Sequence, residues 1–110
     1  MSGKVYRAIR SGWLDDGLLT DKAFRRRPGT DLDGLSVATS HNTAKRLQRS
    51  GAGVAALALR EIEQLGLHVV CPGNHGAIHG LPFDTPDNYA VVIEFADRLC
   101  RIAVFKQDRW

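Results

Sequence analysis

Apolar and polar positions alternate over residues 4–9, where Val5, Arg7 and Ile9 share one side of the chain. A period of two residues is typical of a strand. Short apolar runs bounded by turn-forming residues predict four more strands, at 35–38, 67–70, 77–81 and 101–105. The pair Asp16-Gly17 predicts a tight turn, and the Pro-Gly and Asp-x-Asp-Gly pattern of 27–34 predicts an exposed loop.

The pattern becomes helical in later segments. Ser40 is a suitable cap for a helix that starts at residue 41. Thr20 is a suitable cap for one or two helical turns that start at residue 21. Thr85 and Pro86 favour the start of a longer helix. Its apolar stripe at helical spacing consists of Tyr89, Val92, Ile93, Ala96, Leu99 and Cys100. We expect this stripe to pack on a sheet that contains the strands at 4–9 and 101–105.

Residues 54–67 fit two interpretations. Apolar residues at helical spacing, with Gly66 as a stop, predict one continuous helix. The unbroken apolar run at 54–59 also fits a strand followed by one short helix; we favour the helix. The resulting fold class is α+β, with about five short strands and about three helices in one small domain over 1–110. Residues 106–110 are expected to fray.

Composition sets wide bounds on function. A chain of 110 residues is long enough for one hydrophobic core. Its 44% apolar and 25% charged residues are typical of globular proteins, and its apolar runs are too short to cross a bilayer. The N-terminus lacks the apolar region of a secretory signal. We therefore expect a cytoplasmic protein without a membrane partner, although export that needs no cleaved signal remains open.

The net charge and the two cysteines narrow the possible functions only slightly. The formal net charge of +3 favours anionic partners without identifying one. Cys71 and Cys100 lack the spacing of a metal or redox motif, so we expect two buried thiols instead of a disulfide or a zinc site.

The segment 72–83, "PGNHGAIHGLPF", contains half of the four histidines. Its glycines and prolines oppose a helix, so His75 and His79 do not form the paired ligands of a helical zinc motif. No third ligand has a suitable spacing, and we predict no metal site here. Two interpretations remain: a turn followed by an ordinary strand, or a histidine at a strand end where a ligand approaches a glycine loop.

Several polar residues are candidates for binding an anion. Arg7 interrupts an apolar strand, so it must lie on an open face, pair with an acid, or reach into a cleft that holds phosphate or carboxylate. Ser36, Ser40 and His41 lie at a strand-to-helix junction, where backbone amides favour anions, unless Ser40 is merely the cap. The run 25–27 of arginines is either an anion patch or a solvated loop, and the absence of interleaved aromatic residues weakens single-stranded nucleic-acid binding.

Three of these stretches, "YR" at 6–7, "LSVATS" at 35–40 and "EIE" at 61–63, resemble the landmarks of ADP-ribosyltransferase-like proteins. The stretches "VYRAI" and "GLSV" are similar to small bacterial toxins of that fold, including RES-type NAD-degrading toxins and some type VI secretion effectors. The resemblance implies NAD as substrate. It places Arg7 on the NAD phosphates and Ser36 or Ser40 in the nicotinamide pocket.

The same resemblance assigns catalysis to Glu61 or Glu63, which would hold the ribose and stabilise a cationic transition state. His41, His75 or His79 would replace the glutamate in part. On a helix, however, Glu61 and Glu63 point about 200° apart, and ordinary surface acids are the alternative.

The sequence thus leads to three functional hypotheses. The first is an NAD-directed toxin or effector that performs ADP-ribosyl transfer or NAD hydrolysis, with an immunity or antitoxin protein as partner. The second is a non-enzymatic protein-binding module of a toxin or defence system. The third is a small basic nucleic-acid-binding domain. No P-loop, dinucleotide-binding glycine motif, serine-hydrolase elbow or kinase signature is present.

Overall fold

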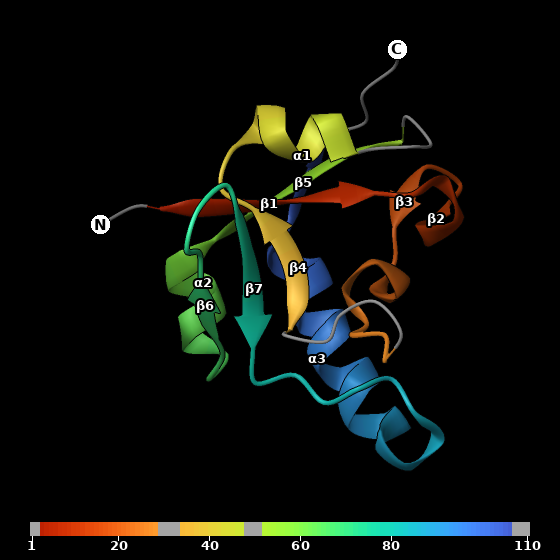
Figure 1. The fold of residues 1–110 in the computed structure, drawn as a ribbon. Coiled ribbons are helices and arrows are strands. Elements are labelled where there is room, and N and C mark those ends of the chain that lie inside the picture. Colours follow the sequence, from red (N-terminus) through yellow and green to blue (C-terminus); the bar gives the residue numbers. More distant parts are fainter. Residues whose placement is uncertain (1–2, 29–33, 48–51, 107–110) are drawn as a thin grey trace.

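The computed structural model describes residues 3–28, 34–47 and 52–106 (Figure 1). Six strands form an antiparallel sheet in the order β6-β7-β4-β1-β5-β8. These are β1 (Lys4–Ile9), β4 (Leu35–Ala38), β5 (Gly53–Ala58), β6 (His68–Val70), β7 (His75–His79) and β8 (Val104–Lys106). Strands β2 (Leu14–Asp15) and β3 (Leu18–Leu19) form a separate hairpin. The predicted α+β class is confirmed, with eight strands within the described residues instead of about five.

Three α-helices are described: α1 (His41–Leu47), α2 (Leu59–Gln64) and α3 (Tyr89–Ile102). Three short 3-10 helices accompany them: η1 (Ser11–Trp13), η2 (Asp21–Phe24) and η3 (Pro86–Asn88). In Figure 1, α1 lies over one face of β1 and β5, whereas α3 lies behind the sheet. Within the described residues, no helix has the length and apolar character that crossing a bilayer requires.

The large sheet consists of two halves that meet at one point. β1 pairs with β5 along its whole length, and β4 pairs with β7 over four residues. Between β1 and β4, in contrast, only Tyr6 and Ala38 are in register. Figure 1 shows β4 and β7 running across the direction of β1 and β5. The half-sheets β6-β7-β4 and β1-β5-β8 therefore diverge on one side of this pair, which leaves a fork between β1 and β4.

The main core lies on one face of the sheet, under α3 and η2. Strand alternation places Val5, Arg7 and Ile9 on this face, as the sequence predicted. The other buried members of the cluster are Ala23, Phe24, Leu35, Val37, Ala55, Leu57, Ile62, Leu67, Ile78, Leu81, Ala96 and Leu99. A smaller cluster of Ala38, Ala44 and Val54 packs on the opposite face beneath α1, together with half-buried Tyr6.

The predicted continuous helix over 54–67 is wrong, and the strand alternative is correct. β5 lies between β1 and β8, with Leu57 in the main core and Val54 under α1. A strand covered on both faces is apolar at successive positions, and such a run cannot be distinguished from a buried helix by its period. α2 then occupies only Leu59–Gln64, and Gly66 follows it with a φ of 84°.

Helix α3 begins later than predicted, but the predicted apolar stripe faces the core except at its first residue. Pro86–Asn88 form η3 before the α-helix starts. Val92, Ala96 and Leu99 are buried, but Tyr89 is 55% exposed. Since α3 continues to Ile102, the last strand starts at Val104 instead of residue 101.

The predictions for a turn, a helix cap and two strand ends have different outcomes. The Asp16-Gly17 turn is confirmed, with positive φ at both residues. The hydroxyl of Thr20 donates to the carbonyl of Trp13, 2.6 Å away, and does not cap η2. The strand predicted at 77–81 is β7, two residues earlier. Lys106 belongs to β8 and so does not fray; residues 107–110 and most of the loop predicted at 27–34 lie outside the described residues.

Candidate functional site: the fork between β1 and β4

Arg7 occupies the fork between β1 and β4. Its side chain is only 6% exposed. Nε donates a hydrogen bond to the carbonyl of Ala23 in η2, and Nη1 donates to the carbonyl of Ser36 in β4 at 2.6 Å. A buried guanidinium requires such acceptors, because it otherwise loses its hydration without compensation. Arg7 therefore ties β1, β4 and η2 together at the point where the half-sheets separate.

The indole ring of Trp13 closes one side of this fork. The guanidinium carbon of Arg7 lies 4.9 Å from the ring centroid, and those of Arg27 and Arg10 lie at 4.9 Å and 5.6 Å. Contacts of this length are favourable cation–π interactions. Trp13, contributed by η1, thereby brings Arg27 beside Arg7 and Arg10 of the preceding segment.

The arginine run 25–27 also contacts aromatic rings. Arg26 stacks on Phe83 at 3.9 Å, and Arg25 lies 5.8 Å from the ring centroid of Tyr89. No aromatic residue interleaves with this run in the sequence, but the fold brings rings from other segments beside it. Phe83 lies 57 positions from Arg26 and Tyr89 lies 64 positions from Arg25, so linear spacing carries no sign of these rings.

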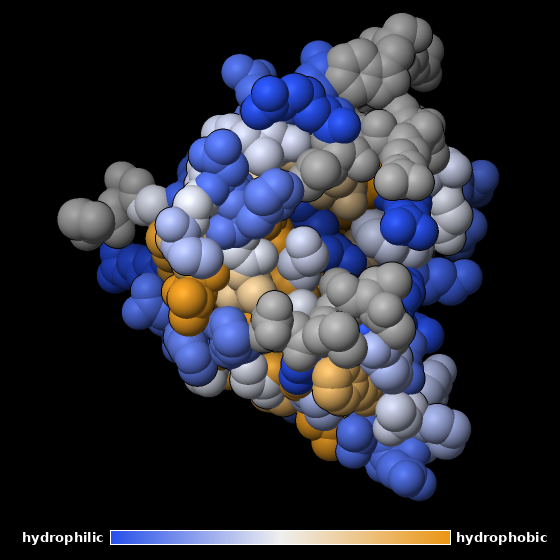
Figure 2. Space-filling model, in the orientation of Figure 1, coloured by the Kyte–Doolittle hydropathy of each residue, from blue (hydrophilic) through white to orange (hydrophobic). Residues whose placement is uncertain are grey.

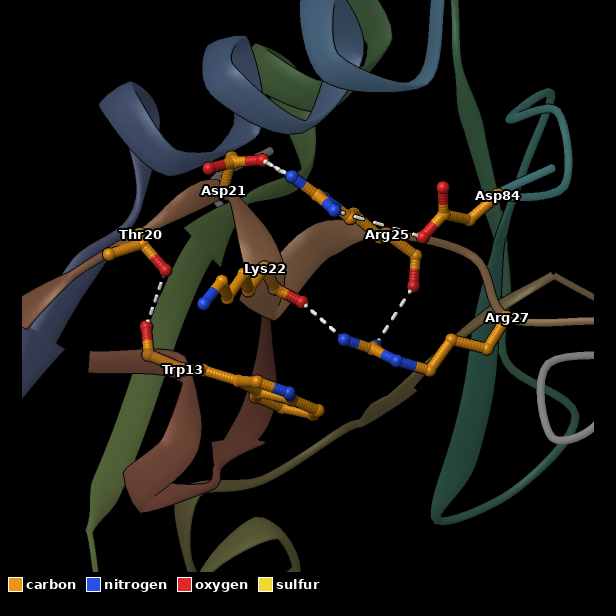
Figure 3. A network of polar contacts seen from close by, with 7 residues as sticks. All are labelled: Trp13, Thr20, Asp21, Lys22, Arg25, Arg27 and Asp84. Atoms are coloured by element: carbon orange, nitrogen blue, oxygen red, sulfur yellow. Dashed lines mark hydrogen bonds and ion pairs between the residues drawn. The ribbon is translucent and has the colours of Figure 1, made fainter. Parts of the chain in front are cut away.

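Hydrogen bonds and ion pairs hold the arginine run in place (Figure 3). Arg27 donates to the carbonyls of Lys22 and Arg25, at 2.8 Å and 3.1 Å. Arg25 binds the carboxylate of Asp21 at 2.7 Å and lies 4.0 Å from that of Asp84. Burial opposes the charged form of Arg25, but the hydrogen bond and charge of Asp21 outweigh it and raise the pKa of the guanidinium. These cations are thus held in fixed positions beside the fork.

The junction residues predicted beside Arg7 lie mostly on the other face of the sheet. Ser36 alternates with buried Leu35 and Val37, so its hydroxyl points away from the core face and only its carbonyl meets Arg7. Ser40 caps α1: its Oγ accepts a hydrogen bond from the backbone N–H of Thr43 at 3.1 Å. The capping interpretation of Ser40 is therefore correct.

His41, at the start of α1, contacts the ring of Tyr6 edge to face, with centroids 6.0 Å apart. His75 and His79 are the first and last residues of β7, so the segment "PGNHGAIHGLPF" is a turn followed by a strand. Within the described part of the chain, no group of three or more His, Cys, Asp or Glu side chains is placed to hold a metal ion.

Glu61 and Glu63 do not approach the fork. Both are exposed on α2, which starts where the N–H of Leu59 bonds to the carbonyl of Gly3, at the N-terminal end of β1. Arg7 instead contacts η2, and Figure 1 shows α2 and the β2-β3 hairpin at opposite ends of β1. The two glutamates line a separate open hollow of about 830 Å³ together with Lys4 and Arg60. The arginine and serine landmarks therefore meet, but the Glu-x-Glu landmark lies elsewhere.

The cysteines differ from the expected pair of buried thiols. Cys71 is exposed and Cys100 is half-buried, and neither forms a disulfide. The thiol of Cys100 donates a long, weak hydrogen bond to the carbonyl of Leu19 at 3.4 Å. Neither sulfur reaches the fork through a described contact.

Sequence reasoning identified Arg7 and Ser36 but missed Trp13, Ala23 and Arg27. Ala23 contributes only a backbone carbonyl, and the role of Trp13 depends on ring contacts that form in the folded chain. In comparisons with known proteins, the chain matches no family model, no curated protein and no solved structure.

Proposed function

We propose that this chain binds NAD at the fork between β1 and β4 and acts on it by ADP-ribosyl transfer or hydrolysis. The observation that supports this proposal is the 2.6 Å hydrogen bond from Arg7 to the carbonyl of Ser36. It joins two of the landmarks that the chain has in common with ADP-ribosyltransferase-like proteins, close to Tyr6 and Ala38, the registered pair that connects the two half-sheets within the described residues.

In this proposal Arg7 is a positioning residue. Its guanidinium is buried and bonded to two carbonyls, so it fixes the walls of the fork instead of gripping the pyrophosphate. Arg10 and Arg27, on the ring of Trp13, supply the positive charge that attracts the phosphates. Figure 2 shows a hollowed surface near the centre of this view, where hydrophilic and hydrophobic residues lie side by side.

The geometry does not support a catalytic role for Glu61 or Glu63 at this fork, because α2 lies at the other end of β1. His79 is likewise at the far end of β7, beside β6. The reaction itself is therefore the part of the proposal that most needs a direct assay.

The test is calorimetric titration with NAD, combined with an assay for nicotinamide release. Arg10→Ala and Arg27→Ala should each weaken NAD binding about tenfold, the loss of roughly one charge-assisted contact. Arg98→Ala is the matched control, because Arg98 is exposed on α3 and pairs with Glu94. If the wild type neither binds NAD at millimolar concentration nor releases nicotinamide, the proposal fails.

One observation favours a second function, a non-enzymatic protein-binding module. Both edge strands expose a valine: Val70 on β6 is 48% exposed and Val104 on β8 is 62% exposed. An edge strand offers unpaired backbone groups to a partner strand. Stable co-purification with a protein that is lost on Val104→Lys would favour this function over NAD binding.

A further inference from the structure

All four histidines lie on the face of the sheet opposite the main core. On β7, His75 and His79 alternate with Ile78, which is in the core cluster. His68 is the register partner of His79 on the neighbouring strand β6. His41 contacts Tyr6, which points away from the core face of β1. The fold therefore gathers imidazoles that are up to 38 residues apart onto one surface.

His68 and His79 form the closest pair among these four residues for which a ring contact is described. They face each other directly across the antiparallel strands β6 and β7. Their ring centroids are 5.3 Å apart and the ring planes differ by 14°. His68 is exposed and His79 is half-buried, and β6 is an edge of the described sheet. The pair is accessible to small solutes.

We propose that His68 and His79 together bind one divalent transition-metal ion, with water in the remaining coordination positions. Imidazole nitrogen binds zinc at about 2.0–2.1 Å, so two nitrogens on one ion lie about 3 Å apart. Residues directly opposite in an antiparallel sheet have Cβ atoms about 5 Å apart, which two imidazole rings can span after small rotations of their side chains. Imidazole favours Zn²⁺, Ni²⁺ and Cu²⁺ over Mg²⁺ and Ca²⁺.

The strand pairing explains why two ligands suffice for measurable binding. Because β6 and β7 hold both rings on one face, coordination by the first imidazole brings the ion within reach of the second, which raises the effective concentration of that ligand. His75 cannot join them, because four residues of strand separate it from His79 by roughly 13 Å. The site is therefore an open chelate on the sheet surface and is not a structural zinc site.

The test is calorimetric titration of the untagged, metal-free chain with NiCl2 and ZnCl2, each variant first checked for its circular dichroism spectrum. The wild type should bind one equivalent of either metal. His68→Asn and His79→Asn should each weaken binding at least about tenfold, because one imidazole no longer chelates. His75→Asn is the matched control, since this histidine lies on the same face of the same strand without an opposing histidine. It should bind as the wild type does.

Cys71→Ser is a second control, because a thiolate is a strong zinc ligand and Cys71 is exposed near the same strands. It should leave binding unchanged. The proposal is overturned if the wild type binds neither metal at millimolar concentration. It is also overturned if His75→Asn or Cys71→Ser reduces the affinity as much as His68→Asn does. NAD binding is measured separately at the fork, so failure of either proposal leaves the other intact.

Discussion

Arg7 donates a hydrogen bond from Nη1 to the backbone carbonyl of Ser36, which is 29 residues further along the chain. β1 and β4 have only one registered pair, Tyr6 with Ala38, so this side chain replaces backbone pairing where the strands diverge. The same guanidinium bonds to Ala23 and stacks on Trp13. The arginine thus links β1, β4 and η2 where the backbones of β1 and β4 diverge.

Arg7→Lys should lower the free energy of unfolding by about 2–4 kcal/mol. Lysine keeps the charge but cannot satisfy both carbonyls from one planar group, and each buried acceptor left without a donor costs about 1–3 kcal/mol. Urea denaturation would measure the change. Arg98→Lys, at an exposed ion pair on α3, should change stability by less than about 0.5 kcal/mol. An Arg7→Lys variant with the wild-type midpoint would show that Arg7 is dispensable to the fork.

Leu99→Ala should destabilise the protein by about 2–5 kcal/mol, because Leu99 is fully buried in the core under α3. Ile93→Ala, on the same helix, should cost less than half as much, since Ile93 is half-buried and is not a member of that core cluster. Thermal and urea denaturation of the two variants would measure this difference. Equal losses would mean that α3 is rotated about its axis relative to the structure described here.

Gly53→Ala should lower the free energy of unfolding by about 2 kcal/mol or more. Gly53 starts β5 with a φ of 147°, and a Cβ atom there would lie 2.3 Å from the carbonyl oxygen of Lys106. Gly73→Ala is the control, because no atom lies within 4 Å of an added Cβ at that position. The control should stay within about 0.5 kcal/mol of the wild type. Normal stability of Gly53→Ala would be incompatible with the pairing of β5 and β8.

The two thiols should make stability fall in alkaline solution. Burial raises the pKa of Cys71, and burial together with the charges of Asp97 and Asp21 raises that of Cys100. Because folding raises the pKa of each thiol, the folded state holds the thiol proton more tightly than the unfolded state does. The stabilisation that results is fully present below the pKa of the unfolded thiol, about 8.5. This contribution is lost as the pH rises through the folded-state pKa values.

Urea denaturation at pH 7.5 and pH 9.5 would measure this effect. The wild type should lose more stability between these pH values than a Cys71→Ser, Cys100→Ala double variant does. The comparison removes the contributions of lysine and tyrosine residues, which both proteins have in common. Equal losses in the two proteins would contradict the raised thiol pKa values.

Elements that depend on interactions between neighbouring residues could be predicted from the amino-acid sequence. The alternation in "KVYRAI" specifies which side of β1 is buried, the Asp16-Gly17 pair specifies its turn, and Ser40 caps α1 through its own hydroxyl. The long amphipathic segment likewise indicated α3, although not the residue at which it begins. Each of these features arises from interactions over a few residues, so a local pattern is enough to reveal it.

Features that depend on which strands become neighbours could not be predicted from local sequence patterns. The run 53–58 is a strand because β1 and β8 flank it, and its composition is equally compatible with a buried helix. The contact of Arg7 with Ser36 and the pairing of His68 with His79 follow from strand order. The rings beside the arginine run come from the segment before α3 and from its first residue. Glu61 and Glu63 lie away from Arg7 because α2 begins at the opposite end of β1. Strand order depends on the burial of apolar surface over the whole chain, so the sequence of a short segment does not reveal it.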